Sequence, residues 1–232
     1  HQLQTKINAA VDSGVEWLKL TQHRDGCWHG HQPKYRNGLT ALCAYALVKS
    51  GVKKDDHYIQ RAVNWLKQVP SDEKIYSAGC TLMLLAALDD DEHRDWAEEL
   101  ADFLVQHQGA GGSSGLWGYP TGSFDFSNSQ YAALGLRAAD QLGVRIPKKT
   151  WESLIQETLS KQVPAQVIDP PPGMEGRSGT GYRLAGFCYR GPDANGGTGS
   201  MTTAGIGCLA IGIQGLGSRG KYSARVQRAN SY

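Results

Sequence analysis

Four stretches of the chain are apolar on almost every side of a helical wheel. Residues 37–52 align with residues 129–144 at an offset of 92 positions, which indicates an internal repeat built from two units of about 46 residues each. Helices that are hydrophobic all round are buried. We therefore expect an inner layer of four related helices, at residues 37–52, 76–88, 129–144 and 200–213.

Between these stretches lie segments with a single apolar stripe and a charged remainder. This pattern is typical of helices that cover a core with one face. We expect a large aromatic residue to anchor each of them, such as Trp17 in the first and Trp151 in the last. The pattern predicts an outer helical layer at residues 5–22, 56–68, 93–108 and 147–162.

Local signals predict where several helices begin and end. Ser127, followed three residues later by Gln130, matches a capping box, and Pro147 suits a first helical turn. Gly51 and Gly143 suit left-handed helix stops.

The joints from outer to inner helices are mostly long, whereas those from inner to outer helices are short. Loops on a rigid scaffold usually carry binding and catalysis. We therefore expect the functional face at the long joints, which are residues 22–36, 108–126 and 162–199.

Composition narrows the possible functions. The 232 residues include 24 Lys and Arg against 22 Asp and Glu, and this net charge of +2 gives no general attraction to nucleic acid. No apolar run reaches the roughly 20 residues that a transmembrane helix needs. Five scattered cysteines favour buried free thiols over a disulfide framework. Because the sequence begins with His1 rather than Met, we expect that a segment is missing upstream, either a signal peptide or part of a longer polypeptide.

Residues 17–28 contain the motif Trp-Leu-x3-Gln-x3-Gly-x-Trp, which resembles the glutamine–tryptophan repeat of squalene and oxidosqualene cyclases. A second copy at residues 103–117 begins with Phe and has three extra residues before Gly-x-Trp. Weaker echoes occur at residues 65–67 and at Gln162 with residues 186–187. The resemblance spans residues 5 to about 214.

The resemblance implies an all-α fold, the α/α-toroid of terpenoid cyclases, protein prenyltransferase β subunits and complement-type thioester domains. In that fold a ring of helical hairpins forms inner and outer helix layers around a central cavity. Four hairpins are visible here against about six in a closed ring, which predicts an incomplete ring. We assign residues 1–214 to this domain and the basic residues 215–232 to a tail or linker.

The glutamines and tryptophans of the motif have a structural explanation. A glutamine at the end of an outer helix can hydrogen-bond exposed backbone groups, and the tryptophan then packs over the joint. We therefore expect Gln22, Trp28, Gln108 and Trp117 to stabilise the fold.

The reactive motifs of the related families are incomplete. Hopene-type cyclases protonate their substrate with an Asp-x-Asp-Asp-type motif, whereas residues 125–128 keep only Asp125, the candidate catalytic residue. Protein prenyltransferases hold zinc through Asp-x-Cys and a later His; residues 25–27 have that spacing, but no later inner-helix His completes the set. The thioester motif Cys-Gly-Glu-Gln is absent. Whether the chain is an enzyme therefore stays open.

Cys27, His29 and His31 lie on one long joint beside His23 and form a candidate zinc site. A thiolate and imidazoles suit Zn²⁺, but the sequence specifies no fourth ligand. The alternative is a solvated polar loop on which Trp28 docks. No other cofactor is expected.

Polar and aromatic residues gather where the third inner helix begins. The helix dipole favours a carboxylate there, so Asp125 suits a capping role. Polar groups ringed by aromatic surface are also typical of small-molecule sites. The candidate ligand-binding residues are Trp28, Tyr35, Trp117, Tyr119, Phe126, Asn128, Gln130, Tyr182, Arg183, Phe187 and Tyr189.

Three functions remain open. The leading hypothesis is a non-catalytic binding or interaction module with an aromatic-lined groove. Its partner is a hydrophobic or isoprenoid-like small molecule, or a protein or peptide on the long-joint face. The second is an active isoprenoid-handling enzyme, in which aromatic rings stabilise a carbocation. The third is a carbohydrate-active α/α-toroid enzyme, which needs paired carboxylates. The long joints offer Asp25, Asp125, Asp169, Glu175 and Asp193.

Overall fold

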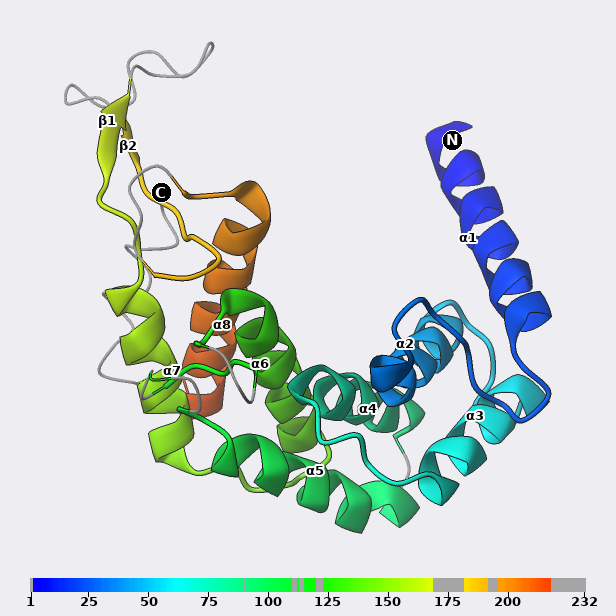
Figure 1. Ribbon diagram of the computed structural model, residues 1–232. Helices are drawn as coiled ribbons and strands as arrows, with labels where there is room; N and C mark the ends of the chain where they lie inside the picture. The colour runs from blue at the N-terminus through cyan, green and yellow to red at the C-terminus, as the bar shows by residue number, and fades with distance from the viewer. Residues whose placement is uncertain are drawn as a thin grey trace. The chain divides into compact units, whose positions relative to one another are not determined.

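A computed structural model describes residues 2–89, 91–109, 112, 115–119, 123–168, 182–191 and 196–217 (Figure 1). The described residues are helical apart from turns, loops and one short hairpin, so the predicted all-α class is confirmed. The chain divides into two compact units, residues 1–104 with 138–145 and residues 105–137 with 146–232. Residues 218–232, most of the predicted tail, lie outside the described residues. No described helix is both long enough and apolar enough to span a membrane.

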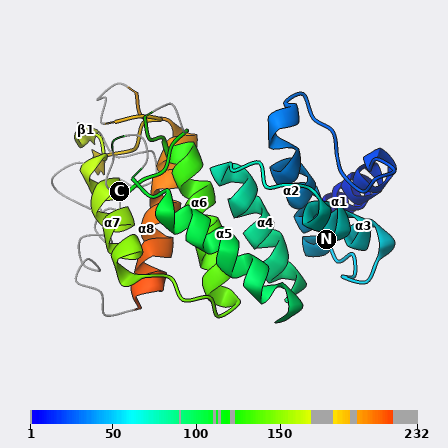
Figure 2. The same cartoon turned by 60° about the horizontal axis from the view of Figure 1, so that its bottom comes forward.

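The first unit is built from helices and two 3₁₀ turns. In chain order these are α1 (Gln2–Thr21), a 3₁₀ turn (Pro33–Tyr35), α2 (Arg36–Lys49), α3 (His57–Gln68), α4 (Ile75–Leu88), a second 3₁₀ turn (Asp91–His93) and α5 (Arg94–Gln106). The apolar helices α2 and α4 lie side by side (Figures 1 and 2). Gly38 permits this approach, because a Cβ there would lie 2.9 Å from Ser77 Oγ. The Gly38 N–H instead donates a hydrogen bond to that oxygen.

The second unit contains most of α6 together with a helix pair and the hairpin. Its elements are α6 (Phe126–Gln141), α7 (Lys148–Ser160), β1 (Gln166–Ile168), β2 (Tyr182–Leu184) and α8 (Gly199–Leu216). α7 and α8 lie side by side, and a Cβ on Gly212 would lie 2.6 Å from Ile155 Cγ1. The strands are antiparallel, with Val167 opposite Arg183.

The predicted contrast between the two helix types holds for the neighbouring helices α3 and α4, whereas the inner helices α2 and α8 bury one stripe each. α4 buries residues on all sides, whereas α3 buries one face at spacings of three and four from Ile59 to Leu66. Gly51 and Gly143 follow α2 and α6 with φ values of +94° and +80°, as left-handed stops require.

Three local predictions differ from the structure. Trp17 does not anchor α1, because it is 63% exposed and α1 buries none of its residues. Ser127 does not cap α6 but lies in its first turn, and Asp125 is the cap that accepts the Asn128 N–H. Pro147 stands one position earlier than predicted, at the N-cap of α7.

Candidate functional site

Gln22 joins the end of α1 to two other backbone segments. Its Nε2 donates to the Gly26 carbonyl (2.8 Å) and to the Tyr58 carbonyl in the first turn of α3 (2.9 Å). Gly26 has a φ of +105°, and a Cβ there would lie 2.4 Å from the Arg61 carbonyl oxygen. This close approach requires the glycine of the motif.

Gln108, which follows α5, makes the same kind of contacts as Gln22. Its Nε2 donates to the Gly115 carbonyl (3.0 Å) and to the Thr150 carbonyl in the first turn of α7 (2.9 Å). A Cβ on Gly115 would lie 2.2 Å from the Ser153 carbonyl oxygen. Both glutamines therefore make the backbone contacts that a stabilising role requires.

The aromatic residue of each joint is buried, and a hydroxyl of the next inner helix accepts its backbone N–H. The weak third copy does the same with phenylalanine. The pairs are Trp28 with Thr40 (3.2 Å), Trp117 with Ser129 (3.0 Å) and Phe187 with Thr202 (3.1 Å). The sequence patterns above do not predict these hydroxyls, although a Ser or Thr 12 to 15 positions after the aromatic residue is their signal.

These hydroxyls correct the repeat alignment. Thr40 and Ser129 accept the equivalent backbone hydrogen bond in the two copies and are 89 positions apart in the sequence. Gly51 and Gly143, which follow the two helices, are 92 positions apart. The inner helix α6 has 16 residues and α2 has 14, so the two copies differ in length within this helix. The offset of 92 therefore holds only toward the C-terminal ends of the two helices.

Asp125, the candidate catalytic residue, is fully buried at the N-terminus of α6. Its Oδ1 accepts hydrogen bonds from the Asn128 N–H (2.8 Å) and the Ser127 hydroxyl. Its Oδ2 accepts one from Asn128 Nδ2 (2.8 Å). Both carboxylate oxygens are therefore engaged by residues of the first helical turn.

Tyr189 contacts the same turn from the long joint before α8. Its carbonyl accepts the Phe126 N–H (3.2 Å), and its hydroxyl is hydrogen-bonded to Ser127 Oγ (3.1 Å). The Ser127 hydrogen bond alone would lower the pKa of Tyr189. Burial, the Asp125 charge and Tyr119 together outweigh it, so the pKa of Tyr189 is raised.

The predicted ligand-binding residues differ in burial. Five of them are at most 3% exposed and pack in the interior, and these are Trp28, Trp117, Phe126, Asn128 and Phe187. The rings of Phe126 and Phe187 meet edge to face with 5.2 Å between centroids. Tyr35, Tyr119 and Gln130 are half-buried, and Tyr189 is 40% exposed. The backbones of Tyr182 and Arg183 belong to β2, but their side chains lie outside the described residues.

Each unit also has a groove. The groove of the second unit, of about 550 Å³, lies between the hairpin and the start of α8, with Val163, Leu184 and Ala185 in its wall. The groove of the first unit, of about 320 Å³, includes Lys67 and Trp96. Of the predicted ligand-binding residues whose side chains the structure describes, none lines either groove.

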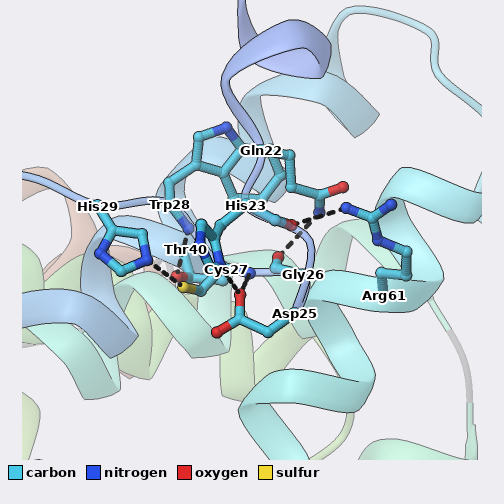
Figure 3. Close-up of polar contacts among 9 residues, drawn as sticks. All are labelled: Gln22, His23, Asp25, Gly26, Cys27, Trp28, His29, Thr40 and Arg61. Carbon is cyan, nitrogen blue, oxygen red and sulfur yellow. Dashed lines mark hydrogen bonds and ion pairs between the residues drawn. The ribbon is translucent and has the colours of Figure 1, made fainter.

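The loop after α1 brings four potential metal ligands together (Figure 3). Ligand atoms of His23, Asp25, Cys27 and His29 all lie within 4.8 Å of one another. Of the predicted zinc ligands, Cys27 and His29 are therefore neighbours, whereas His31 is outside the cluster. His23 and Asp25 were missed as ligands, although the alternation of positions 23, 25, 27 and 29 is a visible signal.

Hydrogen bonds shift the pKa values within this cluster. Burial raises the pKa of Asp25, but hydrogen bonds from the Cys27 backbone and side chain and from His23 outweigh it and lower the pKa to about 2. Burial, with the hydrogen bond to Asp25 and its charge, raises the pKa of Cys27 to about 11. Cys27 is therefore a thiol at neutral pH in the metal-free chain.

Comparisons with known proteins find relatives for part of the chain. Residues 2–74 match the family model of the squalene-hopene cyclase C-terminal domain. Over 140 residues the chain is 26% identical to a protein of Sinorhizobium fredii (strain NBRC 101917 / NGR234) named probable squalene–hopene cyclase. That match covers 60% of this chain and 17% of the relative's length. No solved structure matches the chain significantly.

Proposed function

We propose that the chain is a non-catalytic binding domain of the squalene-cyclase type, a proposal supported by the match of residues 2–74 to the squalene-hopene cyclase C-terminal domain and by the similarity to a probable squalene–hopene cyclase. In this proposal the repeats supply a rigid scaffold. A hydrophobic, isoprenoid-like molecule binds in the groove of the second unit, beside α8.

The observation that carries the proposal is the engagement of Asp125. A general acid must hold its proton within hydrogen-bond reach of the substrate. Asp125 is 0% exposed, and its two oxygens accept hydrogen bonds from Ser127 and Asn128. A carboxylate used as a helix cap in this way is unsuited to protonate a bound polyene.

The neighbours of Asp125 support the same conclusion. Where the hopene-type motif has further carboxylates, this chain has Ser127 and Asn128. Both side chains donate hydrogen bonds to Asp125, whereas a second carboxylate would share a proton with it. Protonation of a substrate would therefore need a different acid.

The groove of the second unit supports a binding role. Its volume of about 550 Å³ falls within the roughly 300–1,000 Å³ of small-molecule sites. Val163, Pro164 and Leu184 give it apolar surface, and Thr198 and Thr202 add hydroxyl groups. This mixture suits an apolar ligand with a polar end.

Native mass spectrometry of the purified chain, after incubation with a lipid extract containing squalene and other isoprenoids, tests the binding role. Ala185→Trp fills the groove, whereas Val167→Trp alters the same hairpin at a residue that is 68% exposed and outside the groove lining. We expect retained lipid mass for the wild type and Val167→Trp and its loss in Ala185→Trp. Absence of any retained lipid on the wild type would overturn the small-molecule role and favour a protein or peptide partner.

A further inference from the structure

We propose that the loop between α1 and α2 is a zinc site whose ligands are His23, Asp25, Cys27 and His29 (Figure 3). The site is independent of the groove of the second unit. It uses residues of the first unit only.

The spacing of the ligand atoms suits a four-coordinate ion. Cys27 Sγ lies 3.4 Å from His29 Nε2, and His23 Nδ1 lies 2.9 Å from Asp25 Oδ1. Zinc bonds of about 2.0–2.3 Å place tetrahedral ligand atoms roughly 3.3–3.8 Å apart. Because every pair is already within 4.8 Å, small side-chain rotations bring the four atoms to that spacing.

The backbone that carries these ligands is fixed by hydrogen bonds within the loop and from neighbouring helices. The His23 N–H donates to the Cys27 carbonyl (2.8 Å), which closes a tight turn. Arg61 Nη2 donates to the His23 carbonyl (2.8 Å), and Gln22 Nε2 donates to the Gly26 carbonyl (2.8 Å). A preformed loop loses less conformational entropy when it binds an ion.

The ligand residues are not required by the joint itself. The second copy of the joint, around Gln108, has Leu116 in the place of Cys27 and Gly118 in the place of His29. It makes the same glutamine and hydroxyl contacts without them. The packing of the repeat therefore leaves the cluster unexplained, and metal binding explains it.

The donor types select the metal. One sulfur, two imidazole nitrogens and one carboxylate oxygen form a set that zinc accepts, whereas calcium and magnesium prefer oxygen ligands. On binding, the Cys27 S–H bond breaks, a sulfur–zinc bond forms and the proton passes to solvent. No oxidant or reductant takes part.

Metal titration of the chelator-treated full chain tests the site. Zinc is titrated in competition with a chromophoric chelator, and cobalt is titrated while the thiolate-to-cobalt charge-transfer absorption is recorded. We expect one ion per chain, a charge-transfer band, and a zinc-dependent rise in Tm. His29→Ala should weaken zinc binding by at least about 10- to 100-fold, and Cys27→Ser should abolish the band.

Two matched variants serve as controls. His31→Ala removes an exposed imidazole of the same loop, and Cys43→Ser removes a half-buried thiol of α2. Both should bind zinc like the wild type. His29 is exposed, so His29→Ala should keep its metal-free Tm even if the buried Cys27→Ser variant is unstable. A wild type without zinc binding, or equal losses in His29→Ala and His31→Ala, would overturn the site.

Discussion

The side-chain amide of Gln108 donates hydrogen bonds to two backbone carbonyls, those of Gly115 and Thr150. Gln108→Ala removes this donor at a half-buried position and should lower the free energy of unfolding by about 1–3 kcal/mol. Urea denaturation measures the change. Gln106→Ala, at an exposed position of the same helix end, should change it by less than about 0.5 kcal/mol. Equal losses in the two variants would contradict the role of the joint.

Asp72 accepts hydrogen bonds from the Ser77 hydroxyl (2.6 Å) and the Lys74 N–H (3.2 Å). Burial raises its pKa above the ordinary 3.8, because these contacts compensate only in part. An acid whose pKa is higher in the folded than in the unfolded state stabilises the fold when protonated, and this contribution disappears as the pH rises through the folded-state pKa.

Asp72→Asn keeps a neutral group of the same shape at this position. The free energy of unfolding of Asp72→Asn, minus that of the wild type, should therefore increase as the pH rises from below 3.8 toward neutrality. Urea denaturation of both proteins across that range measures the difference. A difference that does not change with pH would rule out this explanation.

Residue types were easier to predict from the sequence than residue partners. Cys27 and His29 could be chosen from the sequence as candidate zinc ligands because of their chemistry. The turn that joins His23 to Cys27 folds the loop back, so Asp25 and His23 replace His31 in the cluster. That turn depends on contacts with α3, which no local pattern records.

Two tryptophans of the predicted outer layer differ in their surroundings. Trp151 of α7 is 1% exposed, whereas Trp17 of α1 is 63% exposed. Trp151→Ala should lower the free energy of unfolding by about 3–5 kcal/mol. Trp17→Ala should change it by at most about 0.5 kcal/mol. Guanidinium denaturation distinguishes the two, and a large loss in Trp17→Ala would show that α1 packs in solution.

Two glycines of α8 provide a second matched pair. A Cβ on Gly205 would lie 2.4 Å from the buried Phe187 ring, whereas nothing lies within 4 Å of one on Gly207. Gly207→Ala should stabilise the chain by about 0.5–1 kcal/mol, because alanine favours the helix. Gly205→Ala should destabilise it by about 1–3 kcal/mol through overpacking. Thermal unfolding measures both, and a gain in Gly205→Ala would contradict this packing.

The helices could be predicted because their apolar periods are long and regular. The alternation of all-apolar α4 with one-sided α3 follows directly from such periods. The hairpin could not be predicted in the same way. Each of its strands has only three residues, which is too short for a period-two pattern to stand out from the surrounding loop.

Across the molecule, the fold could be predicted further than the function. The repeat motif reflects two requirements of the backbone: a glutamine at a helix end and a glycine where two backbone segments approach closely. Both requirements are met around Gln22 in the first unit and around Gln108 in the second. The chemistry of a site depends instead on a few side chains and their partners. Asp125 is a candidate acid from the sequence pattern alone, but its hydrogen bonds are those of a helix cap.

The claim that this domain binds without turnover is tested most directly by incubating the purified chain with a linear isoprenoid and analysing the extracted lipids by gas chromatography and mass spectrometry. We predict recovery of unchanged isoprenoid from the wild type and from Asp125→Ala. The variant should lose only stability, about 0.5–2 kcal/mol for a missing helix cap. A cyclised product that forms with the wild type and disappears with Asp125→Ala would contradict binding without turnover.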